Sequence, residues 1–143
     1  MDQVEQTTSP DPPIILLVED EPLIRLLASD ILTEAGFRVI EAMNADEALT
    51  LLEAKPETVA LVTDVKMPGA IDGFGLAHLV KSRWPHMGVV VTSAQALPGE
   101  GDLSDGSIFL AKPYQLSALI DAVRKVRGDQ PPPPITVVRL PDA

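Results

Sequence analysis

Short apolar runs alternate with segments of helical periodicity along most of this chain. We predict strands at residues 14–18, 38–42, 59–63, 88–92 and 108–111, and helices at residues 22–35, 45–54, 74–84 and 115–126. Most of the strand segments show no apolar–polar alternation, which is typical of strands buried on both faces. Strands that alternate with helices indicate a parallel sheet covered by helices on both sides.

The segment between the fourth and fifth predicted strands is a poor helix. It reads AQALPGEGDLSDG over residues 94–106, and its Pro98, Gly99, Gly101 and Gly106 all disfavour helix formation. We therefore predict an α/β fold with a short or degenerate fourth helix. Because crossovers between parallel strands are right-handed, the fold expected is a flavodoxin-like, doubly wound, five-stranded parallel sheet of order 2-1-3-4-5.

Proline marks the expected ends of the folded unit. The chain has 14 prolines, and eight of them lie near the termini, within residues 10–13 and 131–141. We predict a flexible N-terminal tail over residues 1–13, a folded domain over residues 14–128 and a Pro-rich C-terminal tail over residues 129–143. The favoured interpretation of this last segment is a disordered tail. The alternative is that ITVVRL, residues 135–140, adds an edge strand or docks on a partner.

Charge and cysteine content exclude several classes of protein. The 143 residues include 11 basic and 21 acidic side chains, for a net charge of −10, and no cysteine. The chain therefore has no disulfide, thiol nucleophile or Cys-ligated metal site. Its acidity disfavours direct binding of nucleic acid. No apolar run approaches the roughly 20 residues of a membrane span, and the start is not a secretory signal, so we expect no membrane association and a cytoplasmic location.

Polar side chains follow the predicted strands at the end where parallel sheets bind ligands. Glu19 and Asp20 follow the first strand, Asp64 the third, Ser93 the fourth and Lys112 the fifth. Carboxylates brought together repel one another unless a cation shares the site, and hard oxygen ligands favour Mg²⁺. An Asp neutralised in this way can act as a nucleophile toward phosphorus, with an ammonium and a hydroxyl bonding the transferred oxygens.

Four stretches carry a family resemblance. They are VEDEP at residues 18–22, LVTDVKMPG at 61–69, VVVTSA at 89–94 and FLAKPY at 109–114. In this order and spacing, the chain resembles the receiver domain of bacterial two-component response regulators. The resemblance covers essentially all of residues 14–128.

The resemblance implies a role for each matching residue. Asp64 matches the phosphoacceptor, and Lys112 matches the lysine that contacts the phosphoryl group. Mg²⁺ would be held by Asp20 and Asp64, by Glu19 through water and by the backbone carbonyl of Lys66. Ser93 matches the switch hydroxyl. Phe109 matches the switch aromatic, whose ring turns inward when that hydroxyl is drawn to the phosphoryl group.

The function implied is a phosphorylation-dependent switch of a two-component phosphorelay, which accepts its phosphoryl group from a sensor histidine kinase. Such a protein is a phosphoacceptor that assists its own phosphorylation and dephosphorylation, and is not otherwise an enzyme. Since few residues follow Gly128, we expect a stand-alone domain without a DNA-binding output domain, acting through protein contacts. A histidine phosphotransfer protein or a target protein is a further candidate partner, and the oligomeric state stays open.

Two other functions fit the chain less well. A phosphohydrolase of the haloacid dehalogenase type needs a second Asp two residues after its nucleophile, where this chain has Lys66. A nucleotide-binding module needs a Gly-rich or Ser/Thr-rich phosphate loop after the first strand, where this chain has EDEP. A receiver that signals without phosphate is a third alternative, although every expected acidic residue is present.

Overall fold

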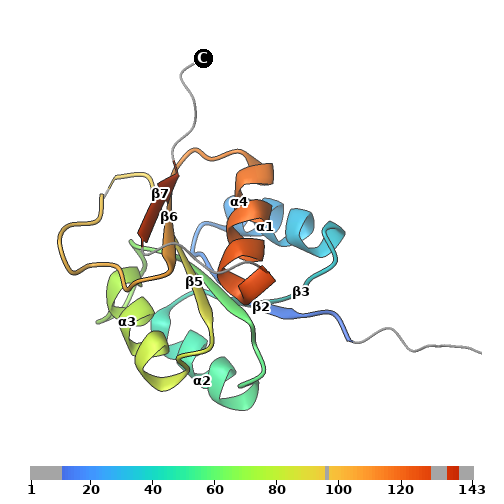
Figure 1. The fold of residues 1–143 in the computed structure, drawn as a ribbon, viewed down its shortest axis with the longest axis horizontal. Coiled ribbons are helices and arrows are strands. Elements are labelled where there is room, and N and C mark those ends of the chain that lie inside the picture. The colour runs from blue at the N-terminus through green and yellow to red at the C-terminus, as the bar shows by residue number, and fades with distance from the viewer. Residues whose placement is uncertain (1–10, 96, 130–134, 139–143) are drawn as a thin grey trace, which may run out of the picture.

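A six-stranded parallel sheet forms the centre of the molecule, with helices on both faces (Figure 1). The structure is a computed structural model that describes residues 11–129, except residue 96, and residues 135–138. The strands are β2 (Ile14–Val18), β3 (Arg38–Ala42), β4 (Ala60–Asp64), β5 (Gly88–Ser93), β6 (Ser107–Ala111) and β7 (Ile135–Val138). Their order is β3-β2-β4-β5-β6-β7, so the first five strands have the predicted order 2-1-3-4-5.

Four α-helices follow the predicted segments closely. They are α1 (Pro22–Glu34), α2 (Ala45–Ala54), α3 (Gly73–Arg83) and α4 (Leu116–Arg124), which continues into the π-helical turn η1 (Lys125–Asp129). The side chains of Glu21, Asn44 and Asp72 cap the first three helices by accepting a backbone N–H. Within the described ranges, no helix combines the length and apolar character that a membrane span requires.

The sheet separates two apolar cores. Helices α1 and α4 cover one face, where Leu32 and Leu119 pack with strand residues such as Ile15. Helices α2 and α3 cover the other face, where Leu52 and Leu76 pack with Leu16 and its neighbours. Successive strand residues thus enter opposite cores, and this is why the strand sequences are apolar without alternation.

A loop takes the place of a helix between β5 and β6. In the described part of residues 94–106 the backbone forms only turns and bends. Leu103 anchors the loop in the core of α2 and α3, with 7% of its surface exposed. The ring of His78 on α3 contacts the same loop, with Nε2 2.9 Å from the Gly101 carbonyl oxygen and Nδ1 3.5 Å from Ser104 Oγ.

Strand β7 extends the sheet beyond the predicted five strands. It pairs in parallel with β6 from Ser107–Ile135 to Leu110–Val138. The favoured sequence interpretation, a tail without fixed structure, is therefore replaced at residues 135–138 by the alternative, an added edge strand. Three of the four residues ITVV are Ile or Val and the other is Thr, all β-branched types that favour strands, and pairing satisfies the otherwise open backbone edge of β6. The rest of the predicted C-terminal tail and residues 1–10 lie outside the described residues, apart from Asp129 at the end of η1.

Candidate functional site

Three carboxylates meet at one rim of the sheet. Glu19 and Asp20 directly follow β2, and Asp64 is the last residue of the neighbouring strand β4. One oxygen of each carboxylate lies within 4.8 Å of the others. Glu19 and Asp64 are only 3% and 9% exposed, whereas Asp20 faces solvent. The structure thus brings together residues that lie far apart in the sequence.

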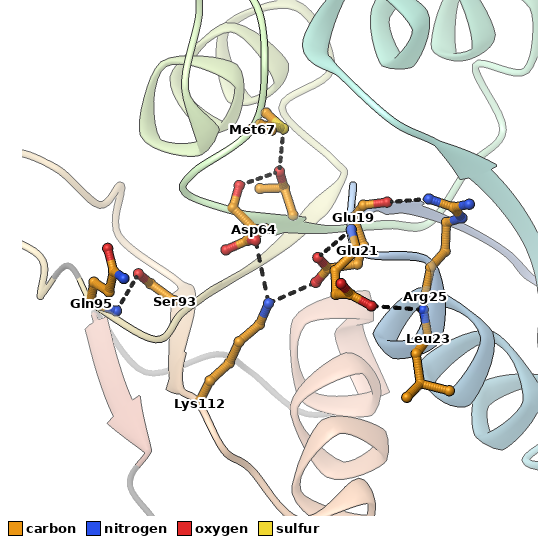
Figure 2. Close-up of polar contacts among 10 residues, drawn as sticks. Glu19, Glu21, Leu23, Arg25, Asp64, Met67, Ser93, Gln95 and Lys112 are labelled. Atoms are coloured by element: carbon orange, nitrogen blue, oxygen red, sulfur yellow. Dashed lines mark hydrogen bonds and ion pairs between the residues drawn. The ribbon is translucent and has the colours of Figure 1, made fainter.

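Lys112 places an ammonium between two of these carboxylates. Its Nζ donates to Glu19 Oε1 at 2.7 Å and to Asp64 Oδ2 at 3.3 Å (Figure 2). Burial alone would lower the pKa of Lys112, but the hydrogen bond to Glu19 and the charges of both carboxylates leave that pKa above its usual value. Burial raises the pKa of Glu19, although Lys112 opposes this shift. The ammonium therefore stays charged and offsets part of the local negative charge.

A cavity of about 230 Å³ opens onto Asp64. It is lined by Asp20, Asp64, Lys66, Ser93, Ala94, Gln95 and Lys112. Ser93 Oγ accepts the Gln95 N–H at 3.3 Å, and the Lys112 N–H donates to the Ser93 carbonyl oxygen at 2.8 Å. The structure thus gathers around Asp64 a hydroxyl, an ammonium and a second carboxylate. The Lys66 side chain is exposed, and the role of its backbone carbonyl stays a prediction.

Two residues that position this site were missed in the sequence analysis. Arg25 Nη1 donates to the Glu19 carbonyl oxygen at 2.8 Å, and its Nε donates to Glu41 at 3.2 Å, so Arg25 ties the acidic loop to α1 and β3. Gly73 lies so close to Asp64 that a Cβ there would be 2.1 Å from the Asp64 carbonyl oxygen. The sequence did carry a signal for each residue. Arg25 lies one helical turn after Glu21, and Gly73 directly follows Asp72, which caps α3.

Phe109 is already inside the core. Its side chain is fully buried and belongs to the cluster that includes Leu103 and Val91. The ring is therefore not in an exposed position from which it could turn inward, as the sequence analysis expected. The reason is tertiary: Phe109 lies in the same apolar cluster as Leu103 of the loop between β5 and β6, and β7 makes β6 an inner strand.

Tyr114 adds a partly buried phenol near the acidic rim. Burial raises its pKa to about 12, and the charges of Glu19 and Asp64 contribute in the same direction. The phenol therefore remains neutral at physiological pH. With Lys112 and Leu116, Tyr114 lines a second, apolar hollow against α1.

Comparison with known proteins agrees with this geometry. The profile of the response regulator receiver domain matches residues 15–124. The chain belongs to this family. The chemotaxis protein CheY of Thermotoga maritima is 32% identical over 78% of this chain and 95% of its own length. A response regulator receiver protein from Sinorhizobium medicae, solved by crystallography, is 30% identical with a TM-score of 0.73, over 82% of this chain and 95% of that one.

Other relatives are much longer than this receiver domain. The response regulator protein FleR of Pseudomonas aeruginosa is 32% identical over 78% of this chain, which spans only 24% of the length of FleR. Receiver domains are signalling proteins of two-component systems and not enzymes in the ordinary sense. Receiver domains bind Mg²⁺ at an acidic pocket, and this chain has an acidic cluster of Glu19, Asp20 and Asp64.

Proposed function

We propose that this receiver domain accepts a phosphoryl group on Asp64 from the phosphohistidine of a sensor histidine kinase, and signals through protein contacts. One observation carries the proposal. The Lys112 ammonium lies 3.3 Å from Asp64 Oδ2, at a cavity that Ser93 also lines. A carboxylate that faces open space beside a fixed cation and a hydroxyl is suited to attack a phosphoryl group and to hold the product.

The transfer exchanges one bond to phosphorus for another. A carboxylate oxygen of Asp64 forms the new O–P bond as the P–N bond to the histidine breaks. The electron pair of the broken bond stays on the imidazole nitrogen, which takes up a proton. Asp64 becomes an acyl phosphate whose additional oxygens would bond to Lys112 and Ser93, which line the same cavity.

The carboxylates fit a divalent cation. Glu19, Asp20 and Asp64 offer hard oxygen ligands, and the single ammonium of Lys112 leaves most of their charge uncompensated. In our proposal Asp20 and Asp64 hold Mg²⁺ directly, Glu19 acts through water and the Lys66 backbone carbonyl completes the set. When bound, Mg²⁺ would supply positive charge that reduces repulsion between these carboxylates and the incoming phosphoryl oxygens.

Signalling follows from the added charge. Ser93 and Lys112 sit at the ends of β5 and β6, so bonds from these residues to the phosphoryl group act on two adjacent strands and on the loop between them. We propose that phosphorylation shifts the populations of two pre-existing conformations, with Ser93 as the switch hydroxyl and Phe109, which is already buried, as a switch residue that repacks inside the core. A histidine phosphotransfer protein or a target protein would read this change.

The test is a mass measurement. With acetyl phosphate and Mg²⁺, we expect the intact protein to gain the mass of one phosphoryl group. The Asp64→Asn variant should gain none, and chelation of Mg²⁺ should suppress the adduct in the parent protein. An unchanged parent mass, or an adduct that persists in Asp64→Asn, would contradict the proposal.

A further inference from the structure

Strand β7 is an addition to the part of the chain that matches the receiver family. The match ends at residue 124, and β7 begins at Ile135. Its parallel pairing with β6 from Ser107 to Leu110 gives β6 a second neighbour, where a five-stranded sheet would leave an open edge (Figure 1). Exposed strand edges accept other strands, so β7 occupies a potential binding surface.

The covered strand leads directly into the site around Asp64. Lys112 is the residue after β6, and its backbone N–H donates to the Ser93 carbonyl oxygen at 2.8 Å. On its other side β6 pairs with β5, through Ser93–Ala111 among other pairs. Strand β6 is therefore paired along one edge with the strand that carries Ser93 and along the other with β7. A shift of Lys112 toward a phosphoryl group would act on both pairings.

We propose that residues 135–138 are a releasable cover for the edge of β6, and that their docking opposes phosphorylation of Asp64. This inference rests on the proposed function. In the structure a docked β7 coexists with the contact between Lys112 and Glu19, at 2.7 Å, which is shorter than the 3.3 Å contact with Asp64. Docking holds β6 in the position that favours the Glu19 contact. By linkage, phosphorylation that draws Lys112 to Asp64 weakens the docking of β7.

The attachment of β7 is suited to release. Among the strands that the structure describes, β7 is the last of the sheet, and it pairs with β6 over four residue pairs. Between η1 and β7 the sequence has only Gln130 and four prolines, so a released strand stays tethered near its site by a short linker. The other end of this tether is firmly held, because the backbone of Val126 in η1 packs so tightly on Gly88 that a Cβ there would lie 2.2 Å from the Val126 carbonyl oxygen.

The occupant of the β6 edge is this chain's own tail. The segment ITVV lies in register on β6 within one molecule, and its β-branched residues favour the strand conformation. Release of the segment would expose the backbone N–H and C=O groups along one edge of β6. The phosphorylated form would thus offer an edge that the unphosphorylated form covers.

The first test removes backbone donors from β7 in the full chain. Proline cannot donate to a ladder, so the Thr136→Pro/Val137→Pro double variant should undock β7. We expect faster amide hydrogen exchange at residues 107–110, and a rate of phosphorylation by acetyl phosphate and Mg²⁺ that rises about fivefold or more. The Asp142→Pro variant, altered beyond β7, should behave as the parent. An unchanged exchange rate at residues 107–110 in the double variant would overturn the docking.

The second test follows the tail of the parent protein. Phosphorylation of Asp64 should speed amide exchange at residues 135–138, and the same treatment of Asp64→Asn should not. If the parent gains a phosphoryl group but residues 135–138 do not respond and the double variant is phosphorylated at the parent rate, the coupling is wrong and the proposed function stands. If the parent gains no phosphoryl group, the proposed function and the coupling are both wrong. Amide hydrogen exchange at residues 107–110 of the unphosphorylated proteins still tests whether β7 docks on β6. If the parent is a dimer that the double variant converts to monomers, the occupant is a second copy's tail and our assignment is overturned.

Discussion

Lys112 divides its ammonium unequally between two buried carboxylates. The contact with Glu19 is 2.7 Å and that with Asp64 is 3.3 Å, so Glu19 holds the stronger hydrogen bond before any phosphoryl group arrives. An acyl phosphate on Asp64 would bring more negative charge and more acceptor oxygens to the weaker side. The balance between these two partners is thus the residue-level event from which a change in β6 would begin.

Gly73 sets the position of Asp64 by having no side chain. In Gly73→Ala, the new methyl group would meet the Asp64 carbonyl oxygen and the Val65 Cα, which are backbone atoms that cannot rotate away. We expect a loss of about 1–3 kcal/mol in the free energy of unfolding and phosphorylation at least about tenfold slower, measured by urea denaturation and by intact mass over time.

Gly75 provides the matched control on the same helix. A Cβ there would meet Cγ2 of Ile71 at 2.7 Å, and this methyl group belongs to a partly exposed side chain that can move. Gly75→Ala should therefore phosphorylate at close to the parent rate. Equal phosphorylation rates in the two variants would show that the approach of Gly73 to Asp64 is not what positions the acceptor.

The loop between β5 and β6 is held from outside by a helix. The described residues of this loop, 94–95 and 97–106, form no helix, and the contacts of His78 with Gly101 and Ser104 supply a tether from α3. We expect His78→Ala to speed amide hydrogen exchange at residues 101–104 by about fivefold. This factor corresponds to about 1 kcal/mol, the net free energy of roughly one lost hydrogen bond. The sheet should exchange as in the parent.

His86 is the natural comparison for that variant, because it is exposed in the turn that follows α3. His86→Ala should leave exchange in residues 101–104 unchanged. If both variants speed the loop equally, or neither does, the tether from His78 does not order it.

The stability of the whole molecule should decrease at alkaline pH because the pKa of Tyr114 is raised in the folded protein. Its pKa is raised from 10.0 to about 12, so the folded protein keeps the phenol proton over a range in which the unfolded chain loses it. The free energy of unfolding should therefore decrease by about 2 kcal/mol as the pH rises from 10 to about 12. Urea denaturation at a series of pH values measures this decrease.

Lys112 contributes in the same range, because its pKa is also raised above 10.5 and its favourable pairing is lost as it deprotonates. Tyr114→Phe separates the two effects, since this variant keeps the lysine and removes the phenol. Its stability should decline less steeply than that of the parent over this pH range. Parallel curves for the two proteins would contradict the raised pKa of Tyr114.

The sequence by itself determined the order of elements and the residues at the strand ends. Hydrophobic periodicity is local, so apolar runs such as residues 14–18 and the amphipathic stripe of α4 can be recognised without knowing what they contact. The convergence of Glu19, Asp64 and Lys112 also followed, because neighbouring parallel strands end at the same rim. Prolines and glycines also predicted a short or degenerate fourth helix, and the described part of residues 94–106 forms only turns and bends.

Only the tertiary structure decided which distant groups touch. Four features each join segments far apart in the chain: the pairing of β7 with β6, the burial of Phe109 in the cluster that includes Leu76, the close approach of Gly73 to Asp64 and the preference of Lys112 for Glu19. Such contacts depend on how whole elements pack, and no local pattern encodes a distance between two of them. Periodicity predicts the strands and helices and the polar residues at their ends. Packing determines which strand edge is covered and which carboxylate makes the shorter contact with the Lys112 ammonium.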